Sequence, residues 1–557
     1  MNNFIVGEAL SSAIETQTVS SEIKFERRDF VEPLIEFCLN QDYRAILGIV
    51  FGLRATGKTV GMLQAAEELS KQGHKVAYAR FNYDETDIKE VNAEILKLAS
   101  DGCTHFFIDE APYLSGFLNN SAEWADRFVP CNRIKIVISG TDSFLLWEAQ
   151  IKSLFHRYIR FPTNFCNFRE YTRITGKGYE DFKKNGGLFT AEDMPEFIQT
   201  AIVDNLLNTI KHCMDDANRT TFYTDVLYGI NASVIYKAVI SILKCVVEDT
   251  LKEHFAHHSD KKNIPELGEA LRGFTSLEKR DIKERVAESV ELYRNFTPVN
   301  RPHDVIEALL QFLIKIGCLF ESRTATSDIY GGHKTLYFSH NALMNYALEE
   351  TRIGIEHMTD TNVDKFTKGL IQAAEGSLNE NIVYAHLMLA CDADEKIYRY
   401  RDDRGREIDA VIINRDKKTI KLFEIKSKST TDDKRVALKD ARHMFDTDVI
   451  ENIGANKEFS VIRVIVSKDK THFVNSKKGL LLIINIEDLL MQYKHLSSYL
   501  DTLIEMARKP VSEKNANEPN TIPPKKTLLQ KLDEGKNGVD KESPHPKKPK
   551  SKSKNER

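Results

Sequence analysis

Three short segments of the chain contain residue types that could carry out chemistry. The first, GLRATGKT at 52–59, has the G-x-x-x-x-G-K-[ST] spacing of a phosphate-binding loop. Its glycines let the backbone curl so that N–H groups point at phosphate oxygens. Lys58 would reach the β- and γ-phosphates of ATP, and the Thr59 hydroxyl would hold Mg²⁺. The residues expected to contact the nucleotide here are Gly52, Arg54, Thr56, Gly57, Lys58 and Thr59.

The second segment, FFIDEA at 106–111, is an apolar run that ends in two acids. After a phosphate loop, this pattern favours a strand end where Asp109 takes part in holding Mg²⁺ and Glu110 orients the attacking water. Acids also occur at strand ends and helix starts for electrostatic reasons alone, and this alternative stays open.

The third segment, GREIDAVIINRDKKTIKLFEIKSK at 405–428, contains two short apolar strands. Asp409 lies on the first, and Glu424 and Lys426 lie on one face of the second, because strand residues alternate faces. Carboxylates on adjacent strands repel, which a divalent cation between them relieves. A nearby lysine can stabilise the charge of a pentavalent phosphate. The pattern therefore indicates metal-dependent phosphodiester cleavage, and an ordinary charged strand surface is the alternative.

The elements that must hold the first two segments follow from hydrophobic patterning. The apolar run RAILGIVFG at 44–52 is typical of a buried parallel strand, and a helical pattern closed by Gly73 follows it. Three more strand-like runs, HKVAYARFNY, THFFIDEA and RIKIVISGT, come next and are separated by helix-length segments. This alternation predicts an α/β fold with a parallel sheet.

With these motifs, the chain resembles the AAA+ ATPases of the bacterial and archaeal family that joins an ATPase to a C-terminal restriction-endonuclease-like domain. VISGTDS at 137–143 is similar to the family's γ-phosphate-sensing turn, which implies a role for Thr141. LFHR ends in Arg157, for which the resemblance implies a nucleotide-sensing or finger arginine, and FREY at 168–171 matches a further family segment. A surface ion pair is the alternative for Arg157.

Two positions depart from this family pattern. His156 stands where glycine is usual, and Pro112 follows Asp-Glu-Ala where the family usually has glutamine.

The third segment resembles the PD-(D/E)xK nucleases. EID at 407–409 and EIK at 424–426 match their pattern, and LNENIV supplies a glutamate on the preceding helix, although Asn379 stands where an aromatic residue is usual. The resemblance implies Asp409 and Glu424 as metal ligands. The implied catalytic residues of this domain are Glu380, Asp409, Glu424 and Lys426.

The expected fold is a multidomain α/β chain with a P-loop AAA+ parallel sheet, a helical and winged-helix middle and a C-terminal restriction-endonuclease-like α/β domain. The expected parts are an N-terminal segment (1–26), the ATPase domain (27–195), a helical domain (196–300), a winged-helix-like module (301–350), the nuclease-like domain (360–495) and a disordered Lys/Pro-rich tail (509–557). The resemblance covers about residues 27–495 and is weakest in the helical middle.

Composition limits the function classes. The net charge of −4 gives no general affinity for polyanions, so nucleic acid would need a local basic patch. The eight cysteines show no short paired spacing, and neither an export signal nor a long apolar span is apparent, so we expect a cytoplasmic protein without a membrane partner.

ATP and Mg²⁺ are the expected cofactors, and nucleic acid and a second copy of the chain are candidate partners. The alternative to an ATP-driven nuclease is a nucleotide-switched regulator or scaffold whose nuclease-like domain binds without cutting.

Overall fold

The structure is a computed structural model that describes most of the chain. The described residues are 3–7, 9–13, 26–53, 55–81, 86–140, 146, 154, 157–163, 166–186, 189, 206, 230–257, 282–289, 302–325, 334–339, 341–358, 363–402, 404–426, 434–454, 458–493 and 495–508. The predicted tail at 509–557 lies outside the described residues, as do Arg54, Thr141 and His156.

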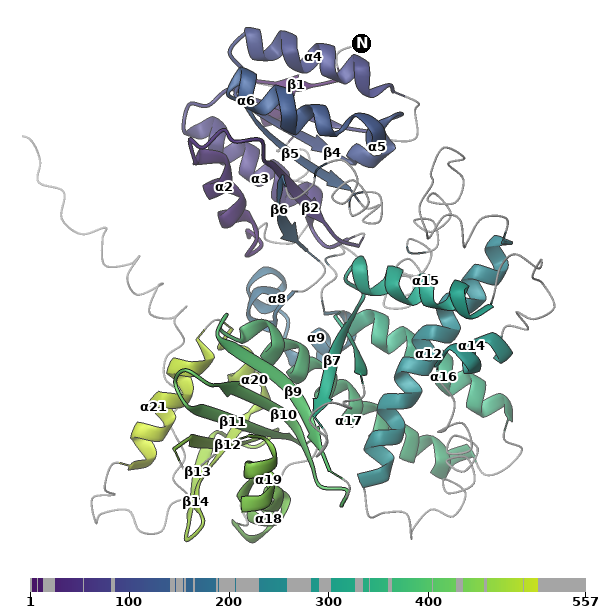
Figure 1. Ribbon diagram of the computed structural model, residues 1–557, viewed down its shortest axis with the longest axis vertical. Helices are drawn as coiled ribbons and strands as arrows, with labels where there is room; N and C mark the ends of the chain where they lie inside the picture. Colours follow the sequence, from purple (N-terminus) through teal and green to yellow (C-terminus); the bar gives the residue numbers. More distant parts are fainter. Residues whose placement is uncertain are drawn as a thin grey trace, which may run out of the picture.

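The N-terminal part folds around a six-stranded sheet with the order β1-β3-β4-β5-β2-β6 (Figure 1). Its strands are β1 (Ile5–Val6), β2 (Leu47–Phe51), β3 (Val76–Arg80), β4 (His105–Asp109), β5 (Lys135–Gly140) and β6 (Tyr158–Pro162). Only β1 is antiparallel to its neighbour within this sheet. The predicted parallel α/β sheet is therefore confirmed for this part of the chain.

Helices cover this sheet and connect its strands. The main ones are α2 (Val31–Leu39), α3 (Lys58–Lys71) and α4 (Ile88–Ser100). The small buried residues Ala65 and Ala66 let α3 pack closely, and every residue of β4 is buried. Because β4 is buried on both faces, its sequence is nearly continuously apolar and does not alternate between apolar and polar residues.

A helical region follows the first sheet. Its elements are α8 (Phe168–Thr175), α9 (Tyr179–Asn185), α12 (Ala232–His257), α14 (Ile282–Ser289), α15 (Pro302–Lys315), α16 (Asn341–Met358) and α17 (Val363–Ala390). Between α15 and α16 lies an antiparallel hairpin of β7 (Leu319–Ala325) and β8 (Lys334–Phe338).

The C-terminal part contains an eight-stranded sheet with the order β13-β14-β12-β11-β10-β9-β7-β8. The new strands are β9 (Glu395–Arg401), β10 (Glu407–Asn414), β11 (Thr419–Ile425), β12 (Ser460–Ser467), β13 (His472–Ser476) and β14 (Gly479–Asn485). The accompanying helices are α18 (Lys434–Asp440), α19 (Thr447–Asn452), α20 (Ile486–Leu490) and α21 (Leu496–Arg508).

The helix and hairpin at 302–338 have the element order that suggested a winged-helix module, but the hairpin also belongs to the second sheet. Thr324 and Ala325 of β7 pair in parallel with Arg399 and Tyr400 of β9. The winged-helix assignment and the domain boundaries stay predictions.

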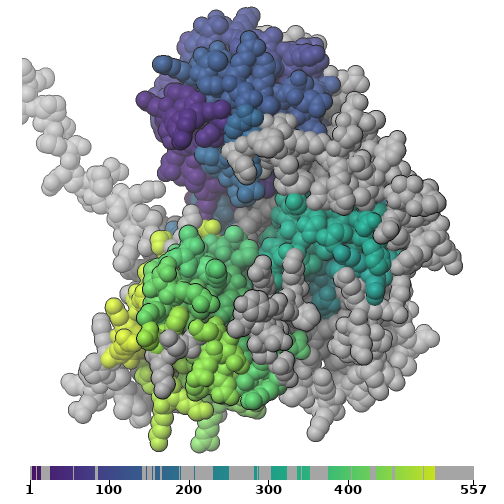
Figure 2. All heavy atoms as spheres, viewed as in Figure 1, coloured from purple at the N-terminus to yellow at the C-terminus, as the bar shows by residue number. Residues whose placement is uncertain are grey.

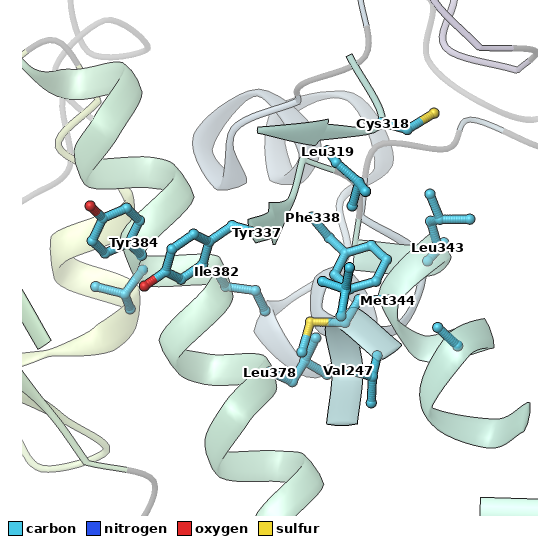
Figure 3. Close-up of a cluster of buried hydrophobic side chains, with 14 of the residues drawn as sticks. Val247, Cys318, Leu319, Tyr337, Phe338, Leu343, Met344, Leu378, Ile382 and Tyr384 are labelled. Atoms are coloured by element: carbon cyan, nitrogen blue, oxygen red, sulfur yellow. The ribbon is translucent and has the colours of Figure 1, made fainter. Parts of the chain in front are cut away.

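One cluster of buried hydrophobic side chains links the helical region to the second sheet and to the loop after β2. It extends from Leu53, after β2, through α8 and α17 to Leu503 of α21. Figure 3 shows part of it, where the rings of Tyr337 and Tyr384 stack with centroids 4.2 Å apart. In the space-filling view the blue N-terminal and green C-terminal residues form two adjoining bodies (Figure 2). Within the described residues, none of the helices combines the length and apolar character needed to cross a bilayer.

Candidate nucleotide site and carboxylate cluster

The predicted phosphate loop connects β2 to α3, the context that this motif requires. Gly57 has φ +82° and directly precedes the helix, a conformation in which glycine is unstrained. Lys58 is buried, and its Nζ donates hydrogen bonds of 2.8 Å to the backbone carbonyls of Gly52 and Leu53. The Lys58 side chain thus lies inside the phosphate loop, where it is predicted to contact a bound phosphate.

The two predicted Mg²⁺ ligands of the nucleotide site lie in direct contact. Thr59 Oγ1 donates to Asp109 Oδ2 at 2.7 Å, and Asp109 is fully buried at the end of β4. The hydroxyl of Tyr78 also donates to Asp109 Oδ2, at 2.9 Å, and Ser139 Oγ donates to Asp109 Oδ1. Burial and then the Asp109 charge raise the pKa of Tyr78, which therefore stays a neutral donor.

The second acid of the pair occupies an unusual backbone conformation. Glu110 has φ +57°, and its N–H donates to Ser139 Oγ at 3.3 Å. The following Pro112 packs against Gly140, where an added Cβ would lie 2.6 Å from the proline Cδ. The proline that departs from the family pattern is therefore accommodated by a glycine on β5.

The predicted sensing arginine is engaged within the chain. Arg157 forms an ion pair with Asp126, and its Nε donates to the Leu154 carbonyl at 2.9 Å. This arrangement matches the ion-pair alternative, and a sensing or finger role for Arg157 stays a prediction.

The predicted nuclease residues come from three elements that meet beside the second sheet. Asp409 lies on β10, Glu424 and Ile425 lie on β11, and Glu380 lies on α17. Asp409 Oδ2 accepts a 2.7 Å hydrogen bond from the Ile425 N–H, and Lys426 Nζ donates to Glu424 Oε1 at 2.6 Å.

An arginine that the sequence patterns did not single out lies among these acids. Arg399 Nη2 is 3.7 Å from Asp409 Oδ1, and it is 3.8 Å from an oxygen of Glu380 and from one of Glu407. Arg399 comes from β9, eight residues before the EID motif, in a run without a recognisable pattern. Its side chain is almost fully buried, so its charge acts on the acids with little screening by water.

The charges of this cluster shift its ionisation. Burial, then the charges of Glu424 and Glu380, raise the pKa of Asp409. Burial alone would lower the pKa of Lys426, but Glu424 and Asp409 outweigh it and raise this pKa. The cluster consequently stabilises cations and resists further negative charge.

The donor sets can be tested against Mg²⁺. Within the described part of the chain, no group of three or more His, Cys, Asp or Glu side chains is arranged to hold a metal ion. Mg²⁺ commonly keeps several waters and takes only one or two carboxylates from the protein. Thr59 with Asp109, and Asp409 with Glu424, offer hard oxygen donors of that kind, so both pairs fit such an ion.

Comparisons with known proteins give a family match over the segment that contains the N-terminal site. Residues 45–172 match the family described as an AAA domain, and residues 375–460 match the family described as a domain of unknown function, DUF4143. No curated protein matches the chain. Among the solved structures that match is the structure of C. elegans PCH-2, at 13% identity and a TM-score of 0.19, covering 56% of this chain and 70% of that chain. A TM-score this low does not establish a shared fold.

The match to the AAA domain covers the phosphate loop, the Asp-Glu pair and the FREY segment. It supports an ATP-binding AAA+ ATPase in the N-terminal part of the chain.

Proposed function

We propose that this chain is an ATPase whose N-terminal domain binds ATP with Mg²⁺ and hydrolyses it. The observation that carries the proposal is the 2.7 Å contact between Thr59 and Asp109 beside the buried Lys58. These residues supply a hydroxyl, a carboxylate and an ammonium group, which a phosphate-loop ATPase needs close together around the nucleotide phosphates.

Each side chain has a role that follows from its position. Lys58 would exchange the carbonyls of Gly52 and Leu53 for phosphate oxygens when ATP binds. Thr59 and Asp109 would hold the Mg²⁺, which neutralises charge on the phosphates. Glu110, whose backbone N–H donates to Ser139 Oγ, would orient the attacking water.

Replacing Lys58 tests nucleotide binding. Lys58→Ala should weaken ATP binding about 10-fold to 150-fold, since it removes a hydrogen bond to a charged group worth about 1.5–3 kcal/mol. Calorimetric titration of purified parent and variant measures the change. Lys71→Ala is the matched control, because Lys71 pairs with Glu67 at the exposed far end of the same helix. Equal ATP affinity of parent and Lys58→Ala would show that GLRATGKT is not the phosphate site.

Replacing Glu110 tests hydrolysis separately. Glu110→Gln keeps the shape of the side chain and removes the charge that orients water, so kcat should fall by about 10²-fold or more. Binding of ATP should remain. Hydrolysis at the parental rate would remove Glu110 from this role.

A second copy of the chain is the proposed partner of this domain. If Arg157 contacts the nucleotide of a neighbouring copy, it must leave Asp126, its ion-pair partner within the chain. Light scattering should then detect an oligomer when ATP is present. A strictly monomeric protein under that condition would exclude this role.

We propose a second function for the C-terminal sheet, Mg²⁺-dependent cleavage of nucleic acid. The observation that favours it is that Glu380 and Asp409 both lie beside one buried arginine, Arg399. Glu424, whose charge acts on Asp409, accepts a hydrogen bond from Lys426. The element order of α17, three antiparallel strands, two short helices and β12 parallel to β11 also fits the nuclease resemblance.

The roles in this second site follow from charge. Asp409 and Glu424 would hold the ion, whose chemistry is to activate water and to neutralise charge on the phosphate. Lys426, kept charged by Glu424, would stabilise the phosphate in the transition state.

Parallel assays separate the two functions. Lys426→Ala should abolish cutting of plasmid and single-stranded substrates while ATP hydrolysis stays near the parental rate. Asp409→Asn should also weaken Mn²⁺ binding, because it removes an anionic oxygen ligand. Lys417→Ala, at the exposed β10–β11 turn, is the control. If the parent cuts no nucleic acid with any metal or nucleotide, the nucleotide-switched scaffold that binds without cutting becomes the better proposal.

A further inference from the structure

A buried ion pair lies directly behind the phosphate loop. Arg28 precedes α2, and its guanidinium contacts the Glu170 carboxylate twice, with Nε–Oε1 at 2.7 Å and Nη2–Oε2 at 3.1 Å. The side chains of Arg28 and Glu170 are 6% and 2% exposed. The two residues come from different elements, because Glu170 lies on α8 and is 142 positions further along the chain.

The same guanidinium reaches the phosphate loop itself. Arg28 Nη1 donates to the Thr56 carbonyl at 2.5 Å and to the Thr163 carbonyl at 3.1 Å. The Thr56 side chain is fixed as well, since its hydroxyl lies 2.6 Å from that of Thr163. An added Cβ at Gly57 would lie 3.2 Å from Arg28 Cδ, so the loop backbone is packed against the arginine.

Electrostatics keep this arginine charged and in place. Burial alone would lower the pKa of the guanidinium, but Glu170 outweighs it and holds the pKa above its ordinary value. Glu170 is itself held, because its Oε1 also accepts the Asp29 N–H at 2.7 Å. Buried ion pairs add little stability on average, since desolvation offsets their attraction. A contribution to folding stability therefore does not by itself explain why a charged pair lies at this position.

The geometry of the peptide unit connects this pair to phosphate binding. The Thr56 carbonyl and the Gly57 N–H belong to one planar trans peptide, so they point in opposite directions. Arg28 draws the carbonyl to the back of the loop and thereby turns the Gly57 N–H away from itself. Loop N–H groups with that orientation are the groups that contact phosphate.

We propose that Arg28 is a positioning residue of the ATP site, which sets the orientation of the Thr56–Gly57 peptide and is itself oriented by Glu170. The proposal rests on the ATPase function proposed above. Arg28 lies outside the residues 45–172 that match the AAA domain, so neither the loop motif nor that match points to it.

The test uses Arg28→Lys in the full-length chain. Lysine keeps the charge beside Glu170, but a single ammonium cannot reproduce the planar fork that also reaches the Thr56 carbonyl. We expect the KM for ATP to rise about tenfold or more, with kcat within about twofold of the parent. The control is Arg27→Lys, because the side chain of the neighbouring Arg27 pairs with Glu32 and Glu68 near the surface and forms no hydrogen bond or ion pair with the described residues of the loop. Its KM should be unchanged.

Measuring KM and kcat separates positioning from a general loss of fold. A partly unfolded preparation contains fewer active molecules, which lowers the apparent kcat and leaves KM unchanged. Glu170→Gln, which keeps the acceptor shape without its charge, is the second variant and should raise KM in the same direction by a smaller factor. An unchanged KM in both variants would overturn the role of Arg28 and leave the ATPase function intact. A parent that neither binds nor hydrolyses ATP would overturn the proposed function and this inference with it.

Discussion

A buried histidine on α17 makes the stability of this helix depend on pH. His386 is 1% exposed, and neither of its ring nitrogens has a hydrogen-bond partner within the described residues. Burial lowers its pKa from 6.5 to about 4. The fold therefore holds the imidazole neutral, and protonation favours the unfolded chain.

The sign and size of the effect follow from this shift. A base with a depressed pKa in the folded state contributes its full stability above about pH 6.5 and loses it as the pH falls toward about 4. Between these two values the loss reaches about 2 kcal/mol at pH 5 and about 3 kcal/mol at pH 4. Because α17 also carries Glu380, the helix that positions this one acid of the carboxylate cluster should loosen at acidic pH.

The substitution His386→Leu isolates this contribution, since leucine has a similar volume and cannot be protonated. Urea unfolding followed by circular dichroism, with hydrogen exchange of α17 amides, compares parent and variant at pH 7.5 and pH 5.0. We expect the variant to gain about 2 kcal/mol over the parent between these pH values. Other titrating groups, such as the buried His105, are present in both proteins and cancel in the comparison.

A matched control is His495→Leu, since His495 is exposed. That variant should differ from the parent by the same amount at both pH values. If the difference between parent and His386→Leu does not change with pH, burial of His386 does not control the acid stability of α17.

Three further predictions concern packing around the two sites. Gly140→Ala should lower the free energy of unfolding by about 1–3 kcal/mol, because the new methyl group would lie 2.6 Å from Pro112 Cδ. The midpoint of thermal unfolding and the rate of ATP turnover should both fall. Tyr179→Phe removes the buried 2.6 Å hydrogen bond to Asn379 Oδ1 and should cost about 1–3 kcal/mol in thermal unfolding, whereas an unchanged midpoint would contradict that value. Asp409→Asn should keep or raise the melting midpoint, because it removes a buried charge next to like charges, and a lower midpoint would contradict this reading of the cluster.

Contiguous motifs made the phosphate loop predictable from the sequence. GLRATGKT contains its glycines, lysine and threonine within eight residues, and the apolar run before it identifies the strand. The parallel sheet was predictable for the same reason, since each strand is a local apolar run.

Contacts between distant positions were not predictable in this way. Tyr78 reaches Asp109 because neighbouring strands place them together, and a tyrosine within VAYAR carries no local signal for that role. Arg28 and Arg399 likewise form ion pairs with acids from other elements, so a single sequence shows the charges without their pairing. Nor could the pairing of β7 with β9 be predicted, because strand order is set by the tertiary fold.

The pairing of β7 with β9 has a consequence for how the chain folds during synthesis. Thr324 pairs with Arg399, so 75 residues (399 − 324) must be added before the edge of β7 finds its partner. At about 5–20 residues per second, this takes about 4–15 s. During that interval the hairpin of β7 and β8 presents unpaired backbone groups, which can pair with another chain. Slow translation through residues 326–399 should therefore favour aggregation, and a chaperone that covers this edge should restore the yield of folded protein.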